Sequence, residues 1–367
     1  MPQGVSIEAH PVYYEDAIER HGQYSRWYQS LPCWCINQDG YAEPKCYYCS
    51  GRGRIFSPFT VRRRVEKVFS FGGVEINTTY KIRAIHKVWT GDGTALTVSS
   101  FTGTTITLDS SLPRGAYATV DYDQDLLSVF TVAGVWEGRG VIRASLAPIL
   151  TDEGTFTGQI IELTSVRNTT QDEGMEVVAF WEDRILTSDI PEDGDEIEVK
   201  GTTVDPVKML VTDLTQKQRL ETMGNLQDAE ASMTFPGYLP VGSGDMITLL
   251  KASQRSSGVG TSKSNVYQLP YFHIDELIEV RDEIGTLTGC QIVRNNQLQF
   301  TERKPEGRFS YNLAYHPSFS IINSLPSLRY GGDKVFPKRV YLKRYDMMSP
   351  GMKQLKSVEK DGFEETF

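Results

Sequence analysis

Four of the five cysteines in this chain fall within seventeen residues, and this cluster constrains the fold more than any other feature of the sequence. They form two pairs, Cys33-Trp-Cys35 and Cys46-Tyr-Tyr-Cys49, and the second pair continues as Cys-x-x-Cys-x-Gly-x-Gly. In a reducing compartment such spacing favours a metal site, because thiolates bind Zn²⁺ tetrahedrally and glutathione keeps thiols from pairing. We therefore predict one structural zinc held by all four cysteines, with no open coordination position for water or substrate.

Two other uses of these cysteines are open at this point. If the protein matures outside the cell, the four residues could form two disulfides. A redox-active Cys-x-x-Cys is the third interpretation, although no βαβ pattern precedes it. The spacing favours zinc, which would staple a segment that has too few apolar residues to fold alone.

The rest of the sequence indicates strands. After Arg64, apolar and polar residues alternate between Gly, Pro and Asp positions, which is the period-two pattern of β structure. The 32 Gly, 17 Pro, 18 Tyr and 16 Phe fit strands joined by turns, and 367 residues exceed what one core usually organises. We predict a mainly β fold: several small β-sandwich or barrel-like units in tandem, with an N-terminal helix, the zinc knuckle and few short helices.

Composition divides the chain into five predicted segments. These are 1–57, the N-terminal helix and zinc knuckle; 58–128, a first β unit; 129–204, a second β unit; 205–325, a third β unit with a short helix and a Gly/Ser loop; and 326–367, a C-terminal strand and flexible tail. Within them, apolar spacing over 12–30 predicts one amphipathic helix, and Asp213 is expected to cap a short helix that ends at Gly224. The Gly/Ser-rich stretch 254–265 is expected to be mobile and the tail from Lys353 disordered.

The second β unit is predicted to repeat the first. At an offset of 79 residues, Val98, Phe101, Ile106, Gly115 and Val120 correspond to Val177, Phe180, Ile185, Gly194 and Val199. With one residue of slippage, Ile85 and Val88 correspond to Leu163 and Val166. A third, looser copy includes Leu277, Val280, Leu298, Gly307 and Tyr311. Self-similarity at a fixed period indicates small structural units joined in series.

Five arginines, Arg52, Arg54, Arg62, Arg63 and Arg64, follow the knuckle within thirteen residues of an otherwise acidic chain. Arginine suits ion pairs at interfaces, so we predict a protein interface here, with a solvated surface or a nucleic-acid contact as alternatives. The net charge of −9 argues against wrapping nucleic acid over a broad surface, which requires many cations. Proteins are the expected partners.

The sequence shows no catalytic constellation. Its five histidines are scattered, and none lies in a metal-binding or nucleophile motif. Residues 258–264 lack a glycine that a phosphate loop needs, and the acidic stretch 192–196 lacks calcium-loop spacing, so a flexible loop and a hairpin turn are predicted. Neither a signal-peptide pattern nor an apolar stretch of membrane-spanning length is evident. We expect a soluble, non-enzymatic protein made in the cytoplasm, without membrane contact.

The run from Trp27 to Phe56, with both cysteine pairs and Gly51-Arg-Gly53-Arg, resembles a cysteine knuckle of structural proteins in tailed bacteriophages, particularly in the head–tail neck. A fainter likeness continues in 224–248 and 309–322. The resemblance implies a virion protein that forms a symmetric homo-oligomeric ring between portal and tail, with the cysteines holding zinc. Its implied partners are portal or adaptor proteins and tail proteins, with packaged DNA as a further contact, and its implied location is the virion after synthesis in the host cytoplasm.

This chain is longer than short connector proteins, because the segment 57–203 looks inserted. A tail or baseplate structural protein is therefore an alternative. A zinc-knuckle nucleic-acid-binding module is another, which DNA binding dependent on Arg62, Arg63 and Arg64 would favour. The Cys-x-x-Cys-x-Gly-x-Gly half-motif is also similar to the zinc repeats of DnaJ-type chaperones, but this chain has a single such module. A β-rich tail hydrolase would need paired catalytic residues that the sequence lacks.

Overall fold

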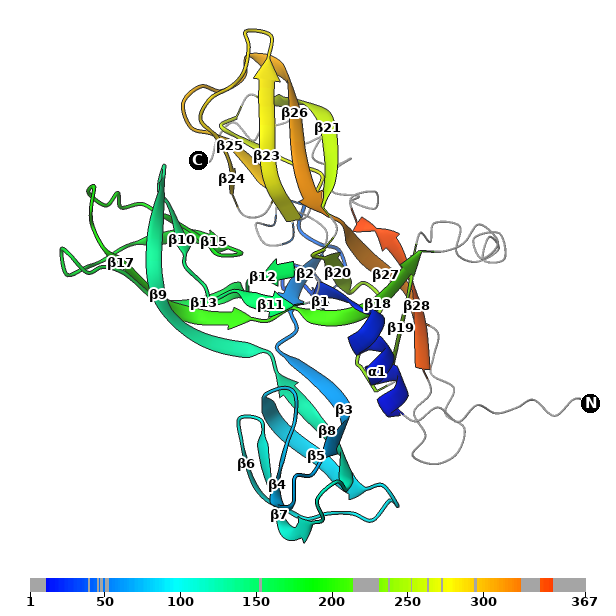
Figure 1. Cartoon of the computed structure of the whole chain (residues 1–367). Helices are drawn as coiled ribbons and strands as arrows, with labels where there is room; N and C mark the ends of the chain where they lie inside the picture. The colour runs from blue at the N-terminus through cyan, green and yellow to red at the C-terminus, as the bar shows by residue number, and fades with distance from the viewer. Residues whose placement is uncertain are drawn as a thin grey trace, which may run out of the picture.

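The computed structural model describes residues 11–345 apart from several gaps. The residues left out within that range are 39, 45, 47–48, 50–52, 152–153, 214–230, 237, 252, 263, 272, 294–295 and 325–336. The described chain is mainly β, as the sequence predicts, with one helix and with strands grouped into a central barrel and three outlying units (Figure 1). No helix in the described ranges is long and apolar enough to cross a membrane.

Six antiparallel strands close the central barrel around one apolar core. In order around the barrel they are β1 (Gln23–Pro32), β18 (Val207–Asp213), β19 (Ala231–Pro236), β28 (Pro337–Arg344), β27 (Ser318–Ser324) and β20 (Met246–Leu249). The sheet closes because β1 pairs with both β20 and β18. Trp27, Met209, Phe235 and Ile247 are buried in its interior. The second half of β1 extends beyond the barrel and pairs there with β2 (Arg54–Pro58).

The N-terminal helix is shorter than predicted. Helix α1 spans Pro11–His21, and the following residues form strand β1 instead of continuing the helix to residue 30. The helix ends at Gly22, whose N–H donates to the Ile18 carbonyl at 2.7 Å. Beyond it, aromatic residues gain pairing strands on both sides, and Trp27 enters the barrel core. Tertiary pairing therefore overrides the helical spacing of these residues.

Unit 1, residues 61–125, packs two three-stranded sheets around a small apolar core. Its strands are β3 (Val61–Phe69), β4 (Gly73–Asn77), β5 (Ile82–Thr90), β6 (Val98–Thr102), β7 (Thr105–Leu112) and β8 (Tyr117–Asp125). One sheet has the order β3-β8-β5 and the other the order β4-β7-β6. Ile106, Leu108, Val120 and Tyr122 are almost fully buried between them.

Unit 3, residues 254–316, has the same strand order as unit 1, namely β21-β26-β23 and β22-β25-β24. Its strands are β21 (Gln254–Ser262), β22 (Val266–Gln268), β23 (His273–Asp282), β24 (Cys290–Val293), β25 (Gln297–Phe300) and β26 (Gly307–His316). The stretch predicted to be a mobile loop, 254–265, is mostly strand β21, which pairs with β26 along its length. Gly258 and Gly260 explain the difference, because a Cβ there would come within 2.3 Å of the Tyr311 hydroxyl and 2.6 Å of the Phe309 ring, respectively.

Units 1 and 3 each contain two three-stranded sheets. In unit 2, residues 127–204, the corresponding strands belong to one seven-stranded sheet. Its strands are β9 (Leu127–Gly138), β10 (Val141–Ala144), β13 (Gln159–Asn168), β14 (Glu173–Gly174), β15 (Val177–Trp181), β16 (Arg184–Thr187) and β17 (Ile197–Val204), with a separate hairpin of β11 (Ile149–Thr151) and β12 (Gly154–Phe156). The order β9-β17-β13 matches β3-β8-β5, and β10-β16-β15 matches β4-β7-β6. The acidic stretch 192–196 is a turn that links the two halves, so it does not form the predicted hairpin.

The three units also share their irregularities. The third strand of each unit carries two bulges: after Ile82 and Ile85 in unit 1, after Ile160 and Leu163 in unit 2, and after Ile274 and Leu277 in unit 3. The next buried residues pair with the last strand: Val88 with Val120, Val166 with Val199, and Val280 with Tyr311. Positions that recur in the sequence therefore occupy equivalent places in three units that share their strand order and bulges.

The barrel is discontinuous in the sequence. Units 1 and 2 lie between β2 and β18, and unit 3 lies between β20 and β27. Barrel strands therefore come from three of the predicted segments, 1–57, 205–325 and 326–367. The predicted helix over 214–224 and the tail from residue 353 lie outside the described residues.

Candidate metal centre

The four clustered cysteines lie at the far end of the β1–β2 hairpin. The two strands pair as far as Pro32 and Arg54, and residues 33–53 form the connecting loop, which we call the knuckle. The ladder continues one step into the knuckle, because the Cys33 N–H donates to the Gly53 carbonyl at 2.9 Å. The hairpin thus holds the two ends of the knuckle side by side.

The four sulfur atoms converge, all within 4.8 Å of one another. Cys33 Sγ is 3.7 Å from Cys46 Sγ, and Cys35 Sγ is 3.4 Å from Cys49 Sγ. A tetrahedral zinc with Zn–S bonds of about 2.3 Å separates its sulfurs by about 3.8 Å, so the spacing fits one central ion. A disulfide needs about 2.05 Å, and none of the four cysteines is disulfide-bonded. The predicted convergence is confirmed, and the four residues are compatible with a structural metal.

Short turns bring the second cysteine pair into position. The Cys46 N–H donates to the Glu43 carbonyl at 3.1 Å, which places this pair after a turn. Gly53 has φ +72°, and its N–H donates to Cys49 Sγ at 3.3 Å. A Cβ at this glycine would also lie 3.2 Å from the Ala42 Cβ. An amide donor of this kind orients a metal-bound sulfur, so Gly53 belongs to the site.

The sulfur atoms themselves form the interior of the knuckle. Cys33, Cys46 and Cys49 are buried, and the partly buried neighbours of this cluster are Cys35 and Ile55. Desolvation by burial, with hydrogen bonds from the other thiols, raises the pKa of Cys35 to about 12. A divalent cation reverses this tendency, since a coordinated thiol is deprotonated. The donor set therefore suits a thiophilic ion, of which zinc is favoured by four cysteines.

The five arginines after the knuckle do not form one surface. Arg52 lies outside the described residues. Arg54 is exposed at the start of β2, where it donates to a serine hydroxyl of β1 at 3.1 Å. Successive side chains of a strand point to opposite faces, so on β3 Arg62 and Arg64 turn inward. Arg63 turns outward, with 40% of its side chain exposed, and makes two contacts of 2.9 and 2.7 Å to an aspartate of β8.

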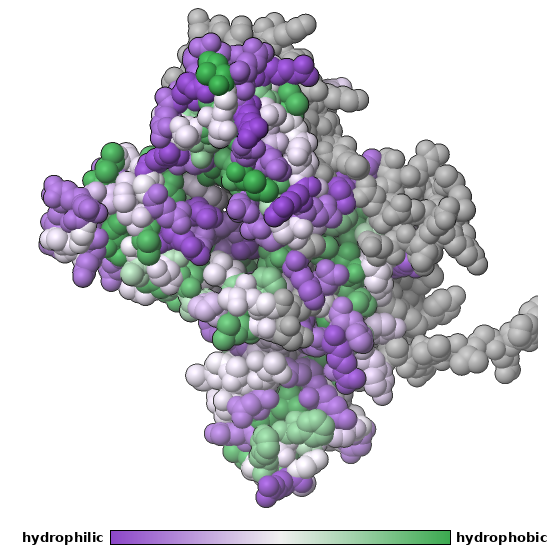
Figure 2. All heavy atoms as spheres, turned by 45° about the horizontal axis from the view of Figure 1, so that its top comes forward, coloured by the Kyte–Doolittle hydropathy of each residue, from purple (hydrophilic) through white to green (hydrophobic). Residues whose placement is uncertain are grey.

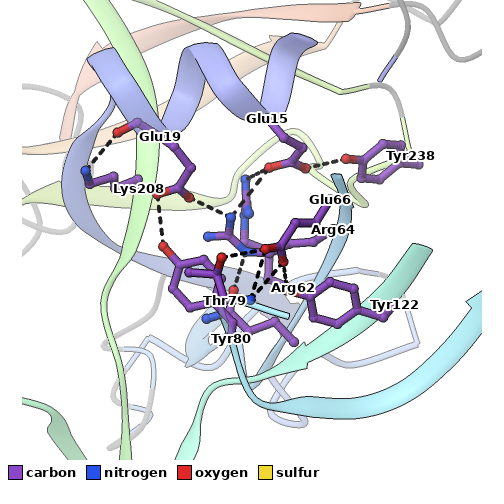
Figure 3. A network of polar contacts seen from close by, with 11 residues as sticks. Glu15, Glu19, Arg62, Arg64, Glu66, Thr79, Tyr80, Tyr122, Lys208 and Tyr238 are labelled. Atoms are coloured by element: carbon purple, nitrogen blue, oxygen red, sulfur yellow. Dashed lines mark hydrogen bonds and ion pairs between the residues drawn. The ribbon is translucent and has the colours of Figure 1, made fainter. Parts of the chain in front are cut away.

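Arg62 and Arg64 are buried in a polar network between helix α1 and unit 1 (Figure 3). Arg62 Nη2 lies 2.9 Å from Glu15 Oε2, and Arg64 Nη1 lies 2.6 Å from Glu19 Oε1. The Arg64 guanidinium also lies 4.0 Å from the centre of the Tyr80 ring. Desolvation by burial raises the pKa of Glu19, but the nearby Arg64 outweighs this effect and holds the pKa below its ordinary value. The predicted interface is corrected for these two arginines, because their partners belong to the same chain.

A second buried polar network joins the barrel to units 2 and 3, and the sequence analysis missed it. The Glu182 carboxylate contacts the Arg26 guanidinium of β1 and lies 2.9 Å from His273 Nδ1 of β23. The Tyr28 hydroxyl lies 3.0 Å from His273 Nε2 and donates to Gln159 Oε1 at 2.8 Å. Burial, and then the nearby Arg26, lower the pKa of His273 well below its usual range. Residues from three separate parts of the chain therefore meet at one buried junction.

The repeat contains a signal that could have found Glu182. This residue lies in the turn between β15 and β16, 79 residues after Gly103 in the turn between β6 and β7. Both residues have positive φ, +51° for Glu182 and +61° for Gly103. A residue with a Cβ is disfavoured in this conformation, so a glutamate in place of the glycine indicates that its carboxylate is used.

Comparisons of the whole chain with known proteins add no relatives: no family model and no curated protein matches it. Function therefore has to follow from the chain itself. Its most informative features are the four-sulfur site at the hairpin tip and the three units of common strand order.

Proposed function

We propose that this chain is a non-enzymatic structural protein of a tailed-phage virion, placed in the neck ring that joins portal to tail. One observation carries the proposal: Cys33, Cys35, Cys46 and Cys49 converge at tetrahedral spacing within the run that resembles the phage knuckle. Four thiolates fill the coordination sphere of zinc, so the ion would hold structure and would not activate water or a substrate.

The knuckle suits a contact element. When bound, zinc supplies the cross-link that fixes residues 33–53 at the end of the hairpin. Trp34 and Tyr41 of this loop are 68% and 73% exposed, and aromatic side chains are enriched in the central contacts of protein interfaces. A knuckle made rigid by the metal would present these rings to a neighbouring protein at a low cost in conformational entropy.

The rest of the molecule has the form of a scaffold. Its central barrel is closed, and three units with one strand order project from it in different directions (Figure 1). Repeated units offer several surfaces on one subunit. This arrangement suits a protein that contacts its neighbours around a symmetric ring, in which one contact recurs at every step.

The proposal is tested in phage particles that encode this protein. Purified particles are examined by mass spectrometry and cryo-EM, beside a mutant phage whose coding sequence for this chain is interrupted. We expect a constant copy number in each particle, ring density between portal and tail, and DNA-filled heads without tails in the mutant. Absence from purified particles, density at the tail tip only, or mutant particles with normal necks would overturn the proposal.

A matched pair of variants tests the metal in the same setting. A plasmid copy of the wild-type chain should restore tails to the mutant phage, and Cys46→Ser should fail to do so. Cys290→Ser should restore them, because Cys290 lies outside the four-sulfur site. Equal rescue by both variants would separate the cysteines from the proposed role.

A further inference from the structure

Units 1 and 2 have equivalent outer ends, formed by the connections that follow β3, β5 and β7 in unit 1 and β9, β13 and β16 in unit 2. In unit 1 these connections are 70–72, 91–97 and 113–116, and in unit 2 they are 139–140, 169–176 and 188–196. In Figure 1 the outer end of unit 1 lies at the bottom of the molecule and that of unit 2 at the left. The exposed side chains of the two ends differ in type and charge, although the strands that carry them follow the same order.

The outer end of unit 1 is aromatic and basic. Phe69 and Phe71 are 59% and 81% exposed, and Phe69 packs edge-on against Tyr117 of β8. Lys67 Nζ lies 3.7 Å from the centre of the Tyr117 ring. Arg114 is exposed in a turn that two backbone hydrogen bonds, of 2.8 and 2.9 Å, join to the turn of Phe71. These five residues are called the aromatic end below.

The outer end of unit 2 is acidic. Its exposed carboxylates are Asp172, Glu173, Glu176, Asp189, Glu192, Asp193 and Glu196, called the acidic end below. Two arginines border this end: Arg167 Nη2 lies 2.6 Å from Asp172 Oδ1, and Arg139 Nη2 lies 3.0 Å from Glu302 Oε1 of unit 3. Ile190 is 76% exposed in the connection 188–196. The Thr169 N–H donates to the Glu196 carbonyl at 2.8 Å, which holds two of the connections together.

The repeat places these opposite groups at the same positions. Arg114 and Tyr117 lie 79 residues before Asp193 and Glu196, around a turn glycine whose φ is +84° in unit 1 and +96° in unit 2. One turn geometry therefore carries a cation and a ring in the first copy and two carboxylates in the second. In Figure 2, hydrophilic side chains cover the left end of the molecule, and an apolar group lies on the lower unit.

We infer that the aromatic end of one copy docks on the acidic end of a second copy of this chain. Within one chain the two ends project in different directions, so they do not cover each other (Figure 1). A contact between two different surfaces is heterologous, and it recurs from copy to copy until a ring closes. This inference rests on the proposed ring role and deepens it by naming the surfaces that meet.

Charge complementarity favours a second copy over a nucleic acid. Rings and cations can also stack on single-stranded bases. The chain carries a net charge of −9, however, which repels a polyanion as it approaches. When the aromatic end docks on the acidic end, Lys67 and Arg114 would form ion pairs with its carboxylates, and Phe71 would pack against Ile190. Exposed rings bordered by charges match the composition of a protein contact centre.

Sedimentation of the full, metal-loaded chain tests the inference with two variants that each lack one end. Phe69→Ser/Phe71→Ser removes the aromatic end, and Asp193→Lys/Glu196→Lys reverses the acidic end. Wild type should self-associate, more weakly at high salt, and each variant alone should associate at least tenfold more weakly. An equimolar mixture of the two variants should form a one-to-one dimer and nothing larger, because each supplies the one end that the other lacks.

Val129→Ser is the matched control, since Val129 is 86% exposed on β9 and lies outside both ends, so this variant should assemble like wild type. Lys67→Glu/Arg114→Glu replaces the serine variant if circular dichroism shows that the latter misfolds. A monomeric wild type, a monomeric mixture, or a serine variant that associates normally would overturn the inference, as would DNA binding in place of self-association. Detection in virions is a separate measurement, so failure of this contact and failure of the proposed function are distinguishable.

Discussion

Only strand β2 separates the knuckle from unit 1 in the sequence, yet the interiors of the two regions are built in different ways. The knuckle, residues 33–53, has sulfur atoms where a core would be, and the isoleucine that packs on them, Ile55, belongs to β2. Unit 1, residues 61–125, encloses ten buried core residues. The size of each segment accounts for the way in which it is stabilised. About twenty residues bury too little apolar surface to offset the conformational entropy of ordering them, whereas six strands bury enough.

Removal of the metal should separate the two regions most sharply. A strong chelator, or Cys46→Ser, should remove the free energy that the proposed zinc would contribute to the knuckle, about 10–16 kcal/mol for a structural zinc, and leave unit 1 folded. Hydrogen exchange measured by mass spectrometry should show lost protection over 33–53 and unchanged protection over β3 to β8. Metal analysis should give about one zinc per chain beforehand. Knuckle amides that stay protected without metal would show that the knuckle folds without an ion.

Arg62→Ala tests how unit 1 is attached to the helix. The substitution should cost up to about 3–5 kcal/mol of unfolding free energy, because buried Glu15 would lose its 2.9 Å partner and keep only the Tyr238 hydroxyl and Arg64 Nη1 at 3.7 Å. Arg63→Ala on the same strand, where the side chain is 40% exposed, should cost about 1 kcal/mol or less. Urea unfolding measures both, with zinc content expected to stay constant. Equal costs would show that burial does not distinguish the two arginines.

The cores of units 1 and 2 should respond alike and without regard to metal. Ile106 and Ile185 are repeat equivalents, and both are fully buried. Substitution of either by alanine should cost about 2–5 kcal/mol through lost burial and a residual cavity. Calorimetry with and without chelator provides the measurement. A cost that changes on chelation would mean that the stability of the units is coupled to the metal state of the knuckle.

The smallest effect concerns pH at the junction of units 2 and 3. Glu182, Arg26, Tyr28 and the more distant His316 surround His273, whose pKa is lowered mainly by burial. The unfolded chain therefore takes up this proton first, near pH 6.5. The contribution of neutral His273 is present above that pH and is lost as the pH falls below it, by at most about 1.4 kcal/mol per pH unit.

Urea unfolding at about pH 7.5 and about pH 6, with hydrogen exchange to locate the change in units 2 and 3, measures this effect. His273→Gln should flatten the dependence. His86→Gln is the control for loss of a histidine, because His86 lies on β5 of unit 1, outside this junction. If the unfolding free energy of His273→Gln changes with pH as much as that of wild type, the acid sensitivity belongs to the knuckle thiolates instead.

Several features could be predicted from the sequence because they depend on short or periodic spacing. The Cys-x-Cys and Cys-x-x-Cys pairs limit how far four sulfurs can separate, and alternation indicates strands wherever one face is buried. The same rules misled where a pattern fits two structures. Apolar spacing over 12–30 suits a helix, but the second half of this stretch forms strand β1. The glycines of β21 leave room for packed aromatic side chains and do not mark a mobile loop.

The close approach of four cysteines, the mainly β fold and the recurring apolar pattern all follow from the order of residues along the chain. The closure of the barrel by distant strands, the inward turn of Arg62 and Arg64, and the meeting of Glu182 with Arg26 and His273 follow from the folded arrangement. The two groups differ in the sequence distance over which their contacts act. Spacing within a few residues sets local geometry, whereas the burial of a charge depends on which remote segment covers it and brings the partner that offsets its desolvation.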